Sequence, residues 1–254
     1  MESNLEVLFT PAEFSALDRR ELSQVVCVVF DVLRATSSML TALTNGASRI
    51  FPVREIPDAL ELRRSHRAAL LAGEREGVRI LSAQTGGVDF DLGNSPREFA
   101  RERVAGREII MTTTNGTRAL HACAGARRIL AGGFLNLRAM ADLIIKENPA
   151  QLLVICAGTF EEAAYEDTVA AGALCDLIWK QFERVKISDS AQIARQIYLA
   201  GENDLERSMR HSRNARRLLA NPELRDDVQF CLRRDSLEIT AELHGNAVTL
   251  SASE

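Results

Sequence analysis

The stretch Glu108-Ile-Ile-Met-Thr-Thr-Thr-Asn-Gly-Thr-Arg118 contains the unit from which the chain is built. Residues 108–111 form an apolar run that predicts a buried strand, and Asn115-Gly116 permits a turn with positive φ. Apolar residues at helical spacing resume after Arg118. The stretch therefore predicts a strand, a polar loop and a helix, and repetition of this order is typical of an α/β fold with a mostly parallel sheet.

The same unit recurs along the chain. The predicted strands are apolar rather than alternating, as expected for strands covered on both faces. They are expected at residues 5–9, 25–30, 49–53, 69–72, 108–111, 128–131 and 152–156. A helical segment over 188–220 and a hairpin over 238–250 are expected as additions to this core. We expect one domain covering residues 1–254.

Composition restricts the class of partner. Of the 254 residues, 46% are hydrophobic, and the formal net charge is −4 with acidic and basic residues interspersed. A nucleic-acid surface would need a basic excess, so a small molecule is the expected partner. The sequence has no secretory signal and no apolar run near the ~20 residues of a membrane span, so a cytoplasmic protein is expected. The apolar helices are compatible with a homodimer, and the sequence leaves the oligomeric state open.

Two loops are candidates for binding phosphate. Hydroxyl, amide and backbone groups of the first loop precede a helix, whose N-terminus favours anions. These groups belong to Thr112, Thr113, Thr114, Asn115, Gly116 and Thr117. The second loop carries Asn94 and Ser95 before Pro96 and a helix expected over 97–104. A turn that merely caps its helix is the alternative for the first loop.

Acidic residues follow several predicted strands. Asp31, Glu74, Glu166 and Asp167 would meet at the carboxyl edge of a parallel sheet, where ligands usually bind. Oxygen ligands of this kind suit magnesium, which neutralises phosphate oxygens. Helix caps or surface charges are the alternative for each residue taken singly.

Arginines could hold the substrate's anionic groups. Arg34 and Arg75 lie in the same predicted loops, and a guanidinium matches phosphate or a second acid group in a bidentate manner. Structural salt bridges are the alternative for both. A further stripe with helical spacing indicates either a solvated helix face or a surface for an anion or a subunit. It consists of Arg207, Arg210, Arg213, Arg216 and Arg217.

Several known phosphate-binding patterns are absent. The chain has no Gly-x4-Gly-Lys-[Ser/Thr] loop and no Gly-x-Gly-x-x-Gly fingerprint after its first strand. Cys156 is followed six positions later by Glu162 and not by arginine, which excludes the thiol-phosphatase loop. Asp31 has no second aspartate two residues later, which excludes the haloacid-dehalogenase arrangement.

Short blocks nevertheless occur in a characteristic order. They are Asp31-Val-Leu-Arg-Ala-Thr-Ser-Ser, Gly73-Glu-Arg75, Leu92-Gly-Asn-Ser-Pro96, Thr112 to Thr117, Cys156-Ala-Gly158, Glu166-Asp167 and Asp227-Val-Gln-Phe-Cys231. In this order they resemble the 2-phosphosulfolactate phosphatase family, nearly end to end. The resemblance implies a three-layer α/β/α sandwich. It also implies a magnesium-dependent enzyme that hydrolyses (2R)-2-phospho-3-sulfolactate to sulfolactate and phosphate on the route to coenzyme M.

Residue roles can then be predicted. We expect Asp31, Glu166 and Asp167 to hold Mg²⁺, and Glu74 or Asp167 to orient or deprotonate water. Attack by Asp31 itself through an aspartyl-phosphate is the alternative. The two polar loops and the arginines Arg34 and Arg75 would bind the substrate. The rival function is a non-catalytic binder or sensor of a phosphorylated 2-hydroxy acid.

Overall fold

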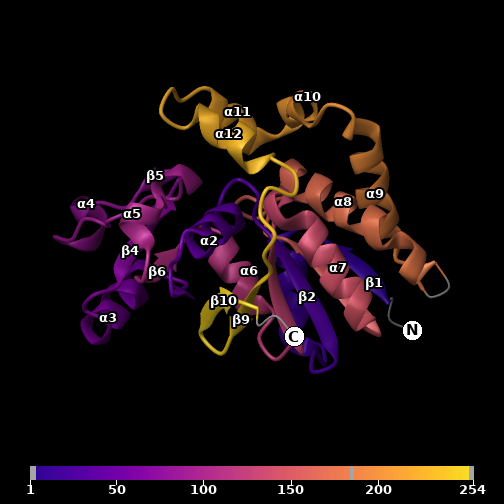
Figure 1. The fold of residues 1–254 in the computed structure, drawn as a ribbon, viewed down its shortest axis with the longest axis horizontal. Coiled ribbons are helices and arrows are strands. Elements are labelled where there is room, and N and C mark those ends of the chain that lie inside the picture. The colour runs from indigo at the N-terminus through magenta and orange to yellow at the C-terminus, as the bar shows by residue number, and fades with distance from the viewer. Residues whose placement is uncertain (1–3, 184–185, 252–254) are drawn as a thin grey trace.

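A computed structural model of the chain describes residues 4–183 and 186–251, and these form one mixed, mostly parallel sheet with helices on both faces (Figure 1). The strand order is β1-β8-β2-β7-β9-β10-β3-β6-β4-β5. The strands are β1 (Leu5–Leu8), β2 (Val25–Phe30), β3 (Arg49–Pro52), β4 (Leu70–Arg75), β5 (Val78–Arg79), β6 (Glu108–Thr112), β7 (Arg128–Gly132), β8 (Gln151–Cys156), β9 (Ala241–His244) and β10 (Ala247–Leu250).

Helices connect most of these strands. They are α1 (Pro11–Ser15), α2 (Ala35–Thr44), α3 (Ile56–Ser65), α4 (Ser82–Thr85), α5 (Arg101–Val104), α6 (Gly116–Ala122), α7 (Leu137–Glu147), α8 (Tyr165–Phe182), α9 (Asp189–Gly201), α10 (Leu205–Ser208), α11 (Arg213–Leu219) and α12 (Arg225–Cys231). Short 3₁₀ turns lie at η1 (Ala16–Arg19), η2 (Pro96–Glu98), η3 (Phe134–Asn136) and η4 (Met209–His211). No helix in the described ranges is long and apolar enough to cross a membrane.

The central strand β2 shows how the layers arise. Its residues are all buried, and alternate side chains enter different cores because successive side chains of a strand point to opposite faces. Val26 and Val28 pack with α7, α8 and α9, whereas Cys27 and Val29 pack with α1, α2 and α6. The expected α/β/α sandwich is therefore confirmed.

The C-terminal hairpin occupies the middle of the sheet. β9 and β10 pair antiparallel with each other as expected for residues 238–250, but β9 also pairs with β7 and β10 with β3. Leu130 lies opposite Glu242, and Val248 lies opposite Ile50. The hairpin thus joins the two parallel halves of the sheet instead of extending its edge, because turn chemistry specifies local pairing and not the neighbouring strands.

The prediction of one helix over residues 97–104 is wrong. The chain forms the 3₁₀ turn η2 and, after a break at Phe99 and Ala100, only one turn of helix in α5. Ser95 precedes η2 but makes no side-chain cap, because its hydroxyl donates to the carboxylate of Asp227 at 2.7 Å. A tertiary contact has therefore replaced the local cap that the sequence indicated.

Helices α10 to α12 lie across one edge of the sheet (Figure 1). β2 and β8 run parallel, and so do β4 and β6, but the three antiparallel pairings through β9 and β10 give these two pairs opposite directions. The loops that follow all four strands nevertheless meet at one place. Residues of α11 and of these loops line one pocket there. The expected helical segment 188–220 comprises α9, α10, η4 and α11, so its last helix contributes to that pocket.

Candidate active site

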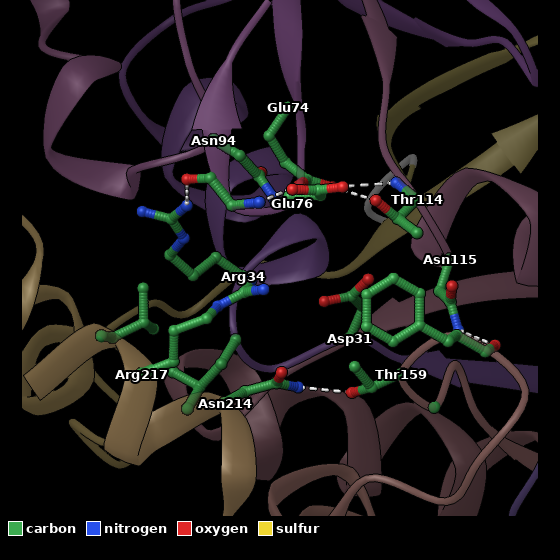
Figure 2. A pocket seen from close by; sticks show the side chains of 15 residues that line it. Asp31, Arg34, Glu74, Glu76, Asn94, Thr114, Asn115, Thr159, Asn214 and Arg217 are labelled. Atoms are coloured by element: carbon green, nitrogen blue, oxygen red, sulfur yellow. Dashed lines mark hydrogen bonds between the residues drawn. The ribbon is translucent and has the colours of Figure 1, made fainter. Parts of the chain in front are cut away.

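The pocket at this place is small, with a cavity volume of about 50 Å³ (Figure 2). Predicted residues that line it are Asp31, Arg34, Glu74, Asn94, Thr114 and Asn115. Lining residues that the sequence did not single out for the site include Glu76, Thr159, Phe160, Asn214 and Arg217. These predicted residues come from four separate segments of the chain, and they meet although the two halves of the sheet run in opposite directions.

Asp31 follows β2 and begins the turn into α2. Its Oδ1 accepts a hydrogen bond from the Ala35 amide at 3.0 Å, and Oδ2 accepts none from the described residues. Burial raises the pKa of Asp31 to about 7, against the opposing effect of the Ala35 bond, and the charges of Glu74 and Glu166 raise it further. A carboxyl group with this pKa can exchange a proton near neutral pH.

Gly116 permits the loop after β6 to approach Asp31 closely. A Cβ atom at this position would lie 2.5 Å from Oδ2 of Asp31 and 2.6 Å from Cβ of Ala35. Both distances are far below van der Waals contact, so a side chain here would force the two loops apart. Gly116 therefore allows the two loops to lie this close because it has no side chain.

Glu74 organises the two loops beside it. Its Oε1 accepts hydrogen bonds from the amide and hydroxyl of Thr114 at 2.8 and 2.9 Å, and its Oε2 accepts one from the Gly77 amide at 2.6 Å. Glu74 lies within β4, whose hairpin partner β5 begins at Val78, so it does not lie in the charged loop that the sequence indicated. With both oxygens engaged, Glu74 is placed to hold the loops in position.

Glu166 and Asp167 lie at the start of α8, and neither is among the residues that line the pocket. Asp167 accepts hydrogen bonds from the amides of Val32 at 2.8 Å and Gly158 at 3.2 Å. Burial raises the pKa of Asp167 well above its usual value, and the charges of Glu166 and Asp31 add to the effect. Asp167 therefore joins the backbone that follows Asp31 to the loop after β8.

Glu166 contacts the C-terminal segment. Its carboxylate accepts hydrogen bonds from the Ser212 hydroxyl and the Asn214 amide, each at 2.6 Å. Asn214 also donates to the Thr159 hydroxyl at 2.6 Å and lines the pocket. Glu166 thus connects α8 to α11 beneath the pocket.

The two predicted arginines have different positions. Arg34 lines the pocket and is buried, with Nη1 2.7 Å from Oδ2 of Asp227 and Nη2 2.8 Å from the Gly77 carbonyl. Arg75 does not line the pocket, because it donates to the Glu74 carbonyl at 2.8 Å and the Thr112 hydroxyl at 3.0 Å. The observed contacts of Arg75 thus fit a structural role, which was the alternative to substrate binding.

Arg217 and Asp227 were missed as site residues, although each had a signal in the sequence. Arg217 belongs to the arginine stripe, and Asp227 begins the last of the ordered blocks. For Thr159, Phe160 and Asn214 no sequence signal pointed to the site.

The threonine loop divides into two sets. Thr113 and Thr117 bond to one another's backbone and side-chain groups, and Thr112 donates to the Arg54 carbonyl at 3.0 Å. The hydroxyls of Thr113 and Thr117 stabilise the turn and that of Thr112 binds a separate segment, while Thr114 and Asn115 line the pocket. Likewise Asn94 lines this pocket whereas Ser95 does not, since Ser95 bonds Asp227.

Two buried amide oxygens at the pocket have no hydrogen-bond donor in the structure, Oδ1 of Asn94 and Oδ1 of Asn115. The orientation of Asn115 follows from its amide group, which donates to the carbonyls of Ala157 and Phe160, both at 2.9 Å. Buried acceptors of this kind need a donor or a cation. Figure 2 shows Asn94 and Asn115 on opposite sides of the pocket, so one ion could not contact both, but the Asp31 carboxylate in the same pocket is the kind of oxygen ligand that Mg²⁺ prefers.

Carboxylates alone do not form a complete metal site. No group of three or more His, Cys, Asp or Glu side chains is arranged to hold a metal ion in the ranges 4–183 and 186–251. Mg²⁺ commonly takes one or two carboxylates and completes its shell with water and substrate phosphate. The expected ligand set of Asp31, Glu166 and Asp167 stays a prediction.

Comparison with known proteins identifies related sequences. The family model described as 2-phosphosulpholactate phosphatase matches residues 12–246. A probable 2-phosphosulfolactate phosphatase of Caldicellulosiruptor saccharolyticus is 37% identical over 231 residues, which cover 89% of this chain and 92% of the relative. The protein of the same name from Caldanaerobacter subterraneus subsp. tengcongensis is 37% identical over 248 residues, covering 96% and 98%. That of Thermotoga maritima is 36% identical over 208 residues, covering 82% and 84%.

Proposed function

Because the chain belongs to the 2-phosphosulpholactate phosphatase family, whose members are named for hydrolysing a phosphoric monoester, we propose that it is a magnesium-dependent phosphatase of phosphorylated 2-hydroxy acids. The expected substrate is (2R)-2-phospho-3-sulfolactate, which would yield sulfolactate and phosphate. This reaction would contribute to coenzyme M synthesis in the cytoplasm. A homodimer is the proposed assembly.

The observation that carries the proposal is the environment of Asp31. This carboxyl group lines the pocket, its Oδ2 accepts no hydrogen bond from the described residues, and in the metal-free protein burial raises its pKa to about 7. Such a group can take a proton from an attacking water molecule and return one to the leaving alkoxide. We assign the acid–base role to Asp31 and not to Asp167, because Asp167 lies outside the lining and both of its oxygens accept backbone hydrogen bonds.

Binding of the phosphoryl group would involve the cations and amides around Asp31. Arg34 presents a fixed guanidinium, and the Asn115 side chain is held by two carbonyl groups. Glu74 keeps Thr114 at the wall of the pocket. Preorganised groups of this kind stabilise charge on a transferring phosphoryl group without rearranging during the reaction.

Mg²⁺ fits the oxygen atoms at this place. Asp31 would hold it directly, water and the substrate phosphate would complete its shell, and the acidic residues Glu166 and Asp167 near Asp31 would favour it. When bound, the ion supplies positive charge that neutralises the phosphate oxygens. It would also remove the electrostatic cost of placing four acidic side chains in one region.

The test is release of inorganic phosphate from phosphosulfolactate, phospholactate and phosphoglycolate, with Mg²⁺ and with EDTA. Release should require Mg²⁺, and Asp31→Asn should lower kcat by about 10³-fold or more if Asp31 is the acid–base group. Asp18→Asn is the matched control, because Asp18 is an exposed carboxylate paired only with Arg19. Binding of these esters without phosphate release in either condition would favour the sensor instead.

A further inference from the structure

Arg217 presents an unpaired positive charge to the pocket. It lies on α11, and its side chain makes no hydrogen bond or ion pair with another residue in the described ranges. Its guanidinium packs against the backbone of Gly77, where a Cβ atom would lie 2.6 Å from Nη2 of Arg217. The glycine therefore allows the arginine to extend along the pocket wall.

Arg34 does not present its charge in the same way. Its guanidinium is 2.7 Å from the buried carboxylate of Asp227, which neutralises it, and a second hydrogen bond joins it to the Gly77 carbonyl. Among the described lining residues, Arg217 is thus the cation without an anionic partner. Glu76 also lines the pocket, but it is exposed and forms no ion pair with Arg217.

The position of Arg217 indicates which part of a ligand it meets. Arg217 lies against Gly77, whereas Asp31 lies beside Gly116 of the loop after β6, so the two side chains face the pocket from different segments; Figure 2 shows the Arg217 guanidinium directed into the pocket. If the phosphoryl group reacts beside Asp31, as the proposed function requires, the group that reaches Arg217 is the other end of the substrate. A guanidinium without an internal partner there matches a second acid group, either carboxylate or sulfonate.

We infer that Arg217 binds the second anionic group of the substrate, so that the pocket selects phosphate esters that carry an acid group over esters that carry none. This inference rests on the proposed function. It assigns substrate choice to the C-terminal helix α11, whereas the reacting groups come from the loops of the sheet.

A pair of substrates that differ only in this charge tests the inference. Phospholactate and its amide, phospholactamide, have the same skeleton and the same phosphate ester, but the amide lacks the carboxylate. Arg217→Ala should lower kcat/KM for phospholactate by about 10- to 100-fold, the usual effect of losing a hydrogen bond to a charged group. For phospholactamide the change should stay below about threefold.

Control variants separate binding from folding. Arg217 is exposed, so its replacement should leave the fold intact, which circular dichroism can verify. Arg210→Ala removes an equal charge from the neighbouring turn η4, outside the pocket lining, and should change neither substrate's kcat/KM. Arg217→Lys should restore part of the preference for phospholactate. Equal loss with both substrates, or loss with neither, would overturn the inference.

A binding measurement tests the inference even if the protein is not a phosphatase. Calorimetry with sulfolactate, which has no phosphate, reports the acid-binding side of the pocket without any turnover. Wild-type protein should bind it at least about tenfold more tightly than Arg217→Ala. Equal affinity would contradict the inference even if phosphate release were confirmed. A difference without phosphate release would support it and would count against the phosphatase.

Discussion

Arg34 and Asp227 form a buried ion pair although they lie 193 positions apart, with Nη1 and Oδ2 separated by 2.7 Å. Their side chains are 3% and 0% exposed. The other oxygen of Asp227 accepts hydrogen bonds from the Ser95 hydroxyl and from Nε of Arg97, each at 2.7 Å. One carboxylate on α12 therefore holds the pocket arginine and the turn after Asn94.

Asp227→Asn should destabilise the protein. It leaves the Arg34 guanidinium buried without an opposing charge, and the loss of one partner of a buried pair typically costs about 3–5 kcal/mol. Any folded Asp227→Asn protein should show a raised KM, because Arg34 loses its fixed orientation. Urea unfolding and steady-state kinetics measure the two effects.

Arg97→Gln is the matched control for this change. Arg97 bonds the same carboxylate, but its side chain is 38% exposed, so its loss should cost about 1 kcal/mol or less. An equal loss of stability in both variants would show that the buried pair has no special role.

Gly116→Ala should impair catalysis in a folded protein. The added Cβ would meet Oδ2 of Asp31 at 2.5 Å, so Asp31 or the loop must move. A displacement of about 1 Å at a reacting group can lower kcat about 100-fold.

Gly245→Ala is the comparison, since Gly245 has φ +59 with nothing within 4 Å of an added Cβ. That variant should lose about 1 kcal/mol of stability from its backbone conformation and keep full activity. Unchanged kcat in Gly116→Ala would contradict the assigned geometry.

The pKa of Asp31 predicts how stability depends on pH in EDTA. The unfolded chain releases this proton near pH 3.8, whereas the folded protein keeps it until about pH 7. Between these values the folded state binds more protons, so the contribution of Asp31 to stability falls as pH rises and is constant above about pH 7.

Asp31→Asn removes this penalty. It should therefore be more stable than wild type at pH 8, by up to about 4 kcal/mol, and should match it near pH 4. Urea unfolding at pH 4, 5.5 and 8 tests this expectation. Added Mg²⁺ should stabilise the wild type more than the variant, because the ion would bind the Asp31 carboxylate. A variant that is less stable than wild type at pH 8 would refute the electrostatic account.

Two threonines of one loop should differ in function. Thr114→Val removes a hydroxyl that lines the pocket and bonds Oε1 of Glu74 at 2.9 Å, so KM should rise. Thr112→Val removes a hydroxyl that bonds the Arg54 carbonyl outside the pocket, so stability should fall by about 1–3 kcal/mol while KM is unchanged. Kinetics combined with thermal unfolding separate these results. A raised KM in Thr112→Val would mean that the whole loop contacts the substrate.

Local patterns in the sequence were sufficient to predict the layers and several of the residues that line the pocket. An apolar run such as residues 25–30 must be buried on both faces, which requires helices above and below the sheet. The expectation that Asp31, Glu74 and Thr114 meet is confirmed, but its reason, one direction for all their strands, is wrong, because β2 runs opposite to β4 and β6. The ordered blocks indicated the family, because such an order depends only on the sequence.

Tertiary structure decided which side chains near the site enter the pocket. Arg75 follows Glu74 directly, yet it points to the Thr112 hydroxyl while Arg217, from a distant helix, enters in its place. The hairpin β9–β10 likewise lies in the centre of the sheet because it pairs with β7 and β3, which are distant in the sequence. Residue type, spacing and turn chemistry act over a few residues and are readable in the sequence. The partner of Arg34 and the orientation of each charged side chain depend on contacts between segments almost 200 positions apart, which form only when the chain has folded.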